Sequence, residues 1–495
     1  MRTNFKMGFK AEDSQGRTKD TITSDVTTLL LPLLFVFGFF AFEEVGSLLY
    51  ILTGILGGFH SVAERFLSHN PPPIRMSNWG GNFQYSTQNI QYPRTANEVQ
   101  SIVKAAKGRM RVLGTRHSFS TIADSADTII CTTHLNRILG LDPSIPSVTV
   151  EPGITYTGLV PFLDTIGFAL PNLASSAEIT VGGASQTGAH GSGITLGSLA
   201  TQIRSLKMVL ANGSFATFGP DNPELKAVAL GLGVFGVITQ VELMIQPSFK
   251  TINQVFFDMP QENVYRHFTQ IQNSGYTVQL FTDFSNLSNW NQVWVNVKSD
   301  NNTMVDQQNF FGAVKGNSQI SPIAALPGRY VMEYYKEQPW YYGMLDYRLG
   351  LSGSNGDEIQ TEWFFPYQNA VPAIKAISKL GAIIAPDLYT MLVRSIEADD
   401  LWMSPQYQGR SVSVHFSWKP NPTAVMEHVR KIEEAIKPYE ARPHWGKIHS
   451  MRPNDFLQYY PKLKDFRKLA DELDPKGKFR NAFIEENVFV DSMSL

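Results

Sequence analysis

A glycine-rich run from residue 170 to residue 193 constrains the fold more than any other stretch of this chain. It carries Gly182, Gly183, Gly188, Gly191 and Gly193 among small hydroxyl side chains and almost no charge. Each interior glycine costs about 1 kcal/mol against alanine in a helix, so we expect no regular helix there. Glycine lets backbone N–H groups approach an oxyanion closely. A flexible linker is the alternative, but regularly spaced apolar residues disfavour it. We therefore interpret the run as a segment that cradles a cofactor phosphate and a flavin.

The composition of the 495-residue chain limits the kind of protein it forms. Its length suffices for two or three domains, and 43% hydrophobic against 17% charged residues is typical of a globular protein with large cores. The formal net charge of −2 offers no basic field, so we expect no nucleic-acid partner. The single cysteine, Cys131, excludes an intramolecular disulfide and a cysteine zinc site. No His-x-His or His-Glu-x-x-His spacing occurs, so we expect no metal.

The first 75 residues differ from the rest of the chain. Residues 1–25 form a polar tail, residues 26–66 are strongly apolar, and residues 67–75 are a proline-rich linker. Glu43 and Glu44 interrupt the apolar segment, and neither half clearly reaches the ~20 residues that a bilayer helix needs. One interrupted span, a re-entrant hairpin, a span with an interfacial helix and a buried hairpin of a soluble domain remain open. We predict a membrane-associated protein anchored through residues 26–62, on an undetermined side of the membrane.

Beyond the linker, short β-type runs alternate with helical ones, which predicts an α+β fold. We expect helices at 97–107 and 155–166, and strands at 111–113, 128–131, 147–150, 205–210 and 236–244. Residues 231–236 match the G-x-G-x-x-G pattern, but they follow a predicted helix and precede a strand. A dinucleotide-binding turn needs the reverse order, so we reject it. We predict a first domain over 76–248, an aromatic-rich second domain over 249–440 and a C-terminal segment over 441–495 that returns to the first.

One histidine stands in a setting that suits a cofactor. His117 follows a predicted strand in the sequence Val-Leu-Gly-Thr-Arg-His-Ser-Phe-Ser, which ends at Ser120. The glycine turn and the hydroxyl side chains suit a backbone wrapped around a phosphate or a ribityl chain. A purely structural histidine is the alternative, and the residues alone do not decide between the two.

Six short motifs follow one another along the chain. They are Gly-x-x-His-Ser-Phe, Leu-Pro-Asn-x-Ala-Ser, Gly-x-x-x-Thr-Gly-x-His-Gly-Ser-Gly, Leu-Gly-x-x-Gly-Val-x-Thr, Arg-Pro-His-Trp-Gly-Lys and Asp-Pro-x-Gly-Lys-Phe. From about Asn78 to Phe483 this order resembles the FAD-linked oxidases of the vanillyl-alcohol-oxidase superfamily, most of all the alditol (xylitol) oxidases and the related aldonolactone oxidases. The resemblance implies a PCMH-type FAD-binding domain of two subdomains. It also implies an α+β substrate (cap) domain with an antiparallel sheet, similar to D-arabinono-1,4-lactone oxidase.

The resemblance also implies roles for individual residues. His117 matches the histidine that bonds covalently to the 8α-methyl group of the flavin, and Ser175 matches a serine placed at both flavin and substrate. The other positions that match cofactor contacts are Val112, Leu113, Gly114, Thr115, Arg116, Ser118, Thr180, Gly183, Thr187, Gly188, Ala189, His190, Val237 and His444. Arg394, Ser417 and Lys447, together with Ser175, match positions that bind a polyol.

These residue types suit the oxidation of an alcohol. A hydride passes to flavin N5, the hydroxyl loses its proton, and fixed cations stabilise the negative charge of the reduced flavin. Arg394 and Lys447 are expected to orient the substrate hydroxyls, and either Lys447 or His444 to assist the departure of the proton. Lys447, Arg394 and His444 are therefore the predicted catalytic residues.

Two positions depart from the family pattern. Arg116 stands where a small residue is usual, and its guanidinium can pair with the pyrophosphate or crowd the flavin. Leu392 stands where alditol oxidases have a glutamate, two residues before Arg394, so we expect the arginine to lose its natural partner. Leucine accepts no hydroxyl, which favours a less hydroxylated alcohol or a lactone over xylitol.

Three functions remain in competition. The first is a membrane-attached FAD-dependent oxidase of CH–OH groups in a polyol or sugar lactone, with O2 as acceptor and H2O2 as product. The second is an oxidase or dehydrogenase of the D-arabinono-1,4-lactone or L-gulonolactone type. The third is an FAD-binding membrane protein that has lost turnover. Release of H2O2 across a panel of polyols and lactones separates them.

Overall fold

The computed structural model describes residues 76–301, 305, 308–317, 320–323, 333–344 and 358–490. All described residues belong to one compact unit, Arg75–Leu495, the second of two units in the chain. The predicted polar tail, apolar segment and proline-rich linker all lie outside the described residues. Among the helices that are described, none combines the length and the apolar character needed to cross a bilayer.

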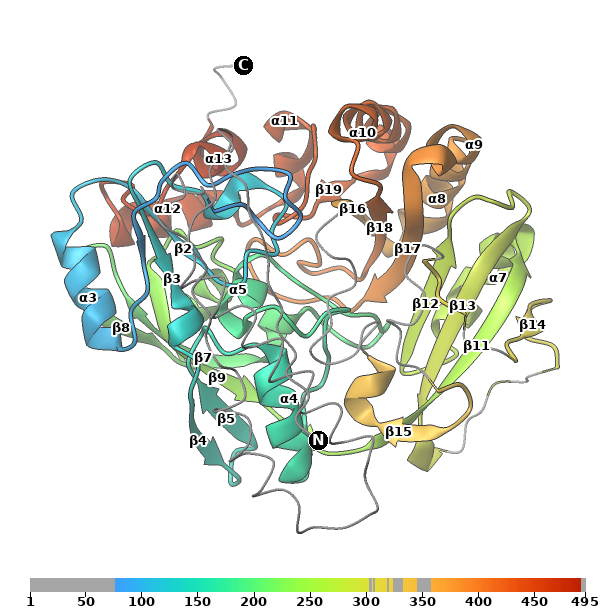
Figure 1. Cartoon of the computed structure of the whole chain (residues 1–495), viewed down its shortest axis with the longest axis horizontal. Coiled ribbons are helices and arrows are strands. Elements are labelled where there is room, and N and C mark those ends of the chain that lie inside the picture. The colour runs from blue at the N-terminus through green and yellow to red at the C-terminus, as the bar shows by residue number, and fades with distance from the viewer. Residues whose placement is uncertain are drawn as a thin grey trace, which may run out of the picture. The chain divides into compact units, whose positions relative to one another are not determined.

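The N-terminal part of the second unit contains two main sheets (Figure 1) and a short antiparallel pair, β6 (Phe168–Ala169) with β10 (Gln246–Pro247). In the smaller sheet, β1 (Ile90–Gln91) and β2 (Met110–Leu113) both pair in parallel with β3 (Thr128–Cys131). The larger sheet is antiparallel, in the order β4-β5-β9-β7-β8. Its strands are β4 (Ile138–Asp142), β5 (Ser147–Val150), β7 (Ile203–Val209), β8 (Phe215–Phe218) and β9 (Val237–Met244).

Two helices of this part begin where the sequence provides a hydroxyl cap. The side chains of Thr95 and Thr155 accept hydrogen bonds from backbone N–H groups in the first turns of α3 (Ala96–Ala105) and α4 (Tyr156–Thr165). Both helices lie within two residues of the predicted bounds. The 231–236 turn follows the short helix α6 (Leu225–Val228) and precedes β9, which is the order that led us to reject a dinucleotide site.

Most of the glycine-rich run is not helical, but it contains a short helix, α5 (Val181–Gln186), so the prediction of no regular helix was wrong for these six residues. The hydroxyl of Thr180 caps this helix by accepting from the Gly183 N–H at 3.3 Å. A side chain at Gly182 would lie 2.8 Å from Pro152, so glycine allows the helix to pack directly against that residue. Packing therefore outweighs the low helix propensity of glycine at this place.

After Pro247 the described chain forms one large antiparallel sheet, in the order β14-β11-β13-β12-β17-β18-β16-β19, with β15 paired to β11. Helices α7 (Gln261–Gln272), α8 (Ala370–Ser378) and α10 (Pro422–Ile436) bury their apolar sides in the same hydrophobic core as this sheet. The mixed helix and sheet architecture, with antiparallel sheets, confirms that part of the predicted fold. The strands are β11 (Lys250–Pro260), β12 (Thr277–Thr282), β13 (Asn289–Lys298), β14 (Val314–Lys315), β15 (Glu337–Pro339), β16 (Ile359–Pro366), β17 (Leu388–Ile396), β18 (Ser411–Trp418) and β19 (Arg442–Pro443).

The chain beyond β19 packs against the N-terminal sheets. It forms α11 (Pro453–Phe456), α12 (Leu463–Leu473) and α13 (Ala482–Ile484), and Figure 1 shows α12 and α13 in red beside the blue strands. The ring of Phe466 on α12 lies 4.9 Å from that of Phe235, and the Met110 N–H donates to Lys478 O at 2.7 Å. The predicted domain boundaries stay predictions.

Arg111 joins these distant segments. Its buried guanidinium donates to the carbonyl oxygens of Ile122 (2.7 Å), Leu232 (2.6 Å), Gly233 (3.1 Å) and Phe479 (2.5 Å). Burial lowers the pKa of this side chain to about 9. All four acceptors are backbone carbonyl oxygens, and they belong to three separate segments of the chain. Arg111 therefore fixes the position of the 231–236 turn relative to β2 and the C-terminal segment.

Candidate active site

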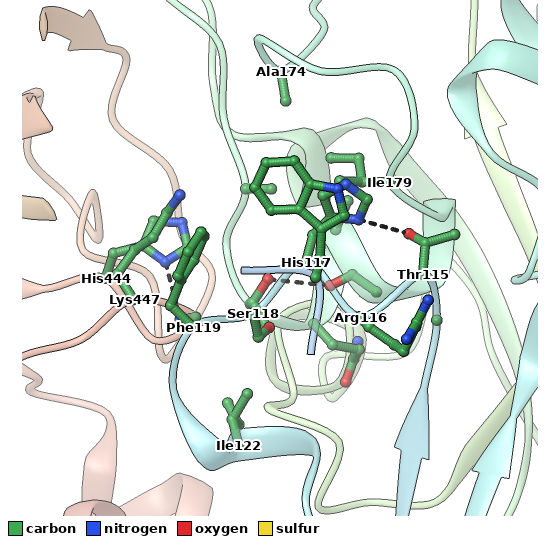
Figure 2. Close-up of a pocket in the computed structure, with 18 of the residues that line it drawn as sticks. Thr115, Arg116, His117, Ser118, Phe119, Ile122, Ala174, Ile179, His444 and Lys447 are labelled. Atoms are coloured by element: carbon green, nitrogen blue, oxygen red, sulfur yellow. Dashed lines mark hydrogen bonds between the residues drawn. The ribbon is translucent and has the colours of Figure 1, made fainter. Parts of the chain in front are cut away.

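Nearly all of the predicted site residues meet around one cavity, part of which opens to solvent. The cavity lies between the turn after β2, the glycine-rich run, the β16–β18 face of the large sheet and the 444–447 turn. Figure 2 shows part of it, with His117 and Thr115 on one side and Phe119, His444 and Lys447 on the other. Predicted residues that line the cavity are Val112, Leu113, Gly114, Thr115, Arg116, His117, Ser118, Ser175, Thr180, Gly183, Thr187, Ala189, His190, Arg394, Ser417, His444 and Lys447. Gly188 and Val237 do not line it, although Gly236 and Ile238 do.

The turn after β2 packs closely against the glycine-rich run. A Cβ at Gly114 would lie 2.1 Å from the Thr180 hydroxyl, so the two backbones approach more closely than any side chain there would allow. Thr180 in turn caps α5. The result is a wall of backbone and small side chains, which fits the phosphate-bearing cofactor that the sequence predicted.

His117 is a half-buried, neutral ring at the edge of this wall. It stacks on Trp79, with ring centroids 4.9 Å apart and planes inclined by 21°, and its Nδ1 lies 3.1 Å from the Thr115 hydroxyl. Burial, assisted by the charge of Lys447, lowers its pKa to about 4. Its Nε2 has no hydrogen-bond partner within the described part of the chain. A neutral ring that lines the cavity and has such a nitrogen is available for a bond to a ligand.

The structure gives a partial explanation for Arg116, the first of the two positions that depart from the family pattern. Its backbone has a positive φ of 68°, and its Nη1 donates to Ser77 O at 2.9 Å. The Arg116 carbonyl accepts from the Trp79 N–H at 2.8 Å. The residue therefore holds the turn against the segment that carries Trp79, which is a role we did not predict.

A buried carboxylate, Glu362 on β16, organises the floor of the cavity. Its Oε1 accepts from Arg394 Nη2 at 2.7 Å and lies 3.1 Å from His190 Nε2, and its Oε2 lies 3.3 Å from His415 Nδ1. Arg394 Nη1 also donates to the Ser175 hydroxyl at 3.2 Å. The expectation that Arg394 loses its partner because Leu392 cannot supply one was therefore wrong: Glu362 supplies it from another strand.

The charges of this cluster follow from burial and pairing. Burial alone would raise the pKa of Glu362, but the charge of Arg394 and the contacts with His190 hold it well below its usual value. Burial lowers the pKa of His190, with the Arg394 charge acting in the same sense, and lowers that of His415 to about 4. At neutral pH the cluster is thus an ion pair, Arg394 with Glu362, surrounded by neutral imidazoles.

His190, Glu362 and His444 are also close enough to be considered as metal ligands, since one ligand atom from each lies within 4.8 Å of the others. The Glu362 oxygen nearest to His190 already accepts from the Arg394 guanidinium. A cation placed there would face this fixed positive charge. We therefore describe the three residues as a hydrogen-bonded cluster.

The 444–447 turn brings two further predicted residues to the cavity. His444 Nδ1 accepts from the Gly446 N–H at 3.0 Å, and burial holds the pKa of His444 well below its usual value. The Lys447 ammonium donates to the Gln360 side chain, whose amide donates to Glu358. Burial lowers the pKa of Lys447 to about 8, although Glu362 and Glu358 oppose the shift.

Sequence reasoning missed several residues of this cavity, among them Glu358, Gln360, Glu362 and His415. Gln360 and Glu362 stand on β16, Glu358 immediately precedes that strand, and His415 stands on β18. Glu362 lies directly opposite His415, and His415 directly opposite Leu392. Alternate residues of a strand share one face, so polar residues at 358, 360 and 362 were a signal for a polar sheet face. Nothing in a single sequence indicates which strand pairs with the one that carries these polar residues.

Comparison with known proteins agrees with this geometry. Residues 87–219 match the family described as FAD binding domain, and residues 355–487 match D-arabinono-1,4-lactone oxidase. The solved structure of a cholesterol oxidase from Brevibacterium sterolicum shares the fold, with a TM-score of 0.65 at 15% identity over 85% of this chain and 99% of that one. The fold and the cavity thus define an FAD-linked oxidoreductase.

The relatives place the chain more closely. It is 31% identical over 414 residues to the alditol oxidase of a Streptomyces species, which covers 83% of this chain and 98% of that protein. It is 26% identical over 436 residues to the L-gulonolactone oxidase of Mus musculus, covering 84% and 99%. The chain belongs to the FAD-linked oxidases that include the alditol and aldonolactone oxidases, which confirms the resemblance seen in its motifs.

Proposed function

We propose that the protein oxidises a CH–OH group of a polyol or sugar lactone with FAD and passes the electrons to O2, giving H2O2. The convergence of Ser175, Arg394 and Lys447 in the cavity that also holds His117 carries this proposal. When bound, FAD supplies the hydride acceptor. The residues of the chain bind and orient the alcohol, exclude water and remove its proton.

Arg394 and Ser175 are suited to orient a substrate hydroxyl. The guanidinium is held from behind by Glu362 and is hydrogen-bonded to Ser175, so both side chains have fixed directions. Fixed donors in a buried site lose little entropy and pay no reorganisation when the substrate binds. Ser417, beside His415 at 3.2 Å, adds a second hydroxyl to the same floor.

The hydrogen bonds support Lys447 over His444 as the group that takes the proton. The neutral ring of His444 accepts at Nδ1, so its hydrogen is on Nε2 and it has no lone pair left to receive another. Lys447, with a pKa of about 8, has a neutral fraction near physiological pH. His444 then acts as a neutral hydrogen-bond donor in the cavity.

A lactone substrate is the second candidate. The match of residues 355–487 to D-arabinono-1,4-lactone oxidase and the L-gulonolactone oxidases among the relatives favour it. The third candidate, a protein without turnover, is disfavoured by the buried Arg394–Glu362 pair and the perturbed Lys447. Steady-state H2O2 release with alditols and with aldonolactones separates the first two. If none of these compounds reduces the flavin in the absence of oxygen, the third candidate, a protein without turnover, would be favoured.

We also propose that FAD is attached covalently through His117, because this half-buried ring lines the cavity, is neutral, and has an inaccessible Nε2 without a hydrogen-bond partner among the described residues. Purified protein is expected to keep its yellow colour on the polypeptide after denaturation in acid or SDS. His117→Ala should release the flavin under the same conditions, and His134→Ala, on an exposed histidine, should not. Flavin that leaves the wild-type chain freely would refute the covalent bond while leaving FAD binding intact.

Membrane attachment through residues 26–62 is a further part of the proposal, supported by the apolar sequence there. Deletion of residues 1–70 should give a soluble, flavin-loaded protein, since the described fold begins at Met76. The full-length chain should fractionate with membranes, and the truncated chain with the supernatant. If the truncated chain aggregates without flavin, the leader belongs to the folded core.

A further inference from the structure

The face of the large sheet that lines the cavity has two chemically different halves. On β16, β18 and β17 it presents polar side chains: Gln360, Glu362, His415, Ser417 and Arg394. On the other side of β17 the same face carries the buried polar side chains Gln279 and Gln292 together with an apolar cluster. Leu392 stands directly opposite Phe281 on β12, and these two pack with Trp294 on β13 and Val255 on β11 as one buried cluster.

This apolar cluster reaches the cavity itself. Leu392, Phe281 and Ile323 all line it, with exposed fractions of 4%, 3% and 2%. We call these three residues the apolar subsite. Trp294 packs against Phe281 of this subsite, with the ring centroids 4.6 Å apart. None of the three lining side chains can donate or accept a hydrogen bond.

The position of the subsite relative to Arg394 limits what can occupy it. Leu392 and Arg394 are alternate residues of β17, so they share a face and stand about 6–7 Å apart along the strand. A substrate whose hydroxyl meets Arg394 and Ser175 therefore places carbon atoms three or four bonds away against Leu392. A hydroxyl in contact with the three side chains of the apolar subsite would lose its water and gain no hydrogen bond from them, whereas a methylene group would gain favourable apolar contact.

We propose that the substrate is an alcohol with hydroxyls at its reacting end and an aliphatic substituent at the other end, which fills the apolar subsite. This inference rests on the proposed oxidation of a CH–OH group and names its substrate class. Fully hydroxylated alditols such as xylitol and sorbitol are then poor substrates, because their distal hydroxyls meet Leu392 and Phe281.

The test is a homologous series of 1,2-alkanediols from propanediol to octanediol, with xylitol and sorbitol as comparisons. Flavin reduction is followed without oxygen, so that the acceptor does not matter. We expect kcat/KM for the wild type to rise about three- to fourfold per methylene until the subsite is full. Leu392→Glu should flatten this dependence and raise kcat/KM for xylitol and sorbitol, with the flavin still bound. Leu392→Met should keep the dependence, and Leu392→Gln replaces the glutamate variant if that fails to fold.

The outcomes distinguish this inference from the proposed function. Efficient turnover of xylitol with no dependence on diol length would overturn the apolar subsite and leave the oxidase intact. If no compound reduces the flavin, the proposed function fails. The dissociation constants of the diols, measured by the change in the flavin absorption spectrum, then decide the subsite alone. Constants that do not fall with chain length would overturn it.

Discussion

Lys447→Met is expected to lower the rate of flavin reduction by about 10²–10⁴-fold, which is the usual contribution of a positioned acid or base. Methionine has a similar length but carries no lone pair that can take a proton at this pH. In the wild type, burial lowers the Lys447 pKa to about 8. The neutral amine is the reactive form, so the rate of reduction should rise as the pH rises through about 8 and become constant above it.

The matched variant is Lys447→Arg, which keeps the positive charge but cannot lose it in this range. If proton removal is the role of Lys447, both variants are slow and both lose the rise near pH 8. If the residue serves only as a cation for the reduced flavin, the arginine variant keeps most of its rate. Stopped-flow absorbance at the flavin band measures all three proteins, and an unchanged pH profile in Lys447→Arg would refute the assignment.

Glu362→Gln is expected to lower the free energy of unfolding by about 3–5 kcal/mol, the cost of leaving one partner of a buried ion pair without the other. The carboxylate is 2% exposed and faces Arg394 Nη2 at 2.7 Å, so water does not replace it. Glu397→Gln is the control, because Glu397 pairs with Arg410 at 2.6 Å while its side chain is 32% exposed. Such a pair contributes about 0–1 kcal/mol. Denaturant unfolding of the wild type, Glu362→Gln and Glu397→Gln measures how much each substitution lowers the free energy of unfolding.

The pH dependence of the same variant has a defined sign. The pKa of Glu362 is lower in the folded protein than in the unfolded chain. Its contribution to stability is therefore complete above the unfolded value, about 4.3, and is lost as the pH falls through the folded value. The difference between wild type and Glu362→Gln should be constant near neutral pH and shrink in acid. A difference that does not change between neutral pH and strong acid would contradict the assignment of a charged Glu362.

The sequence predicted those parts of the site whose signal is local. The turn that carries His117, the glycine-rich run and the 444–447 turn are contiguous motifs, so their chemistry could be predicted without knowing the fold. The role of Glu362 could not be predicted, because it arises from pairing between β16, β18 and β17, which brings Glu362 to Arg394 and His415 across 32 and 53 positions of the sequence. For the same reason the consequence of Leu392 for Arg394 was misjudged, since the compensating carboxylate comes from another strand. The helix within the glycine-rich run was missed because its stability depends on packing against Pro152.

The guanidinium of Arg111 has a consequence for how the protein matures. It is hydrogen-bonded to Phe479 across 368 positions of the sequence, and it also holds the 231–236 turn that borders the cavity. During synthesis, β2 leaves the ribosome long before its partner at 479, so Arg111 lacks part of its final hydrogen bonding until almost the whole described fold has emerged. The cavity wall therefore reaches its final form late, and cofactor loading is expected to follow translation rather than accompany it.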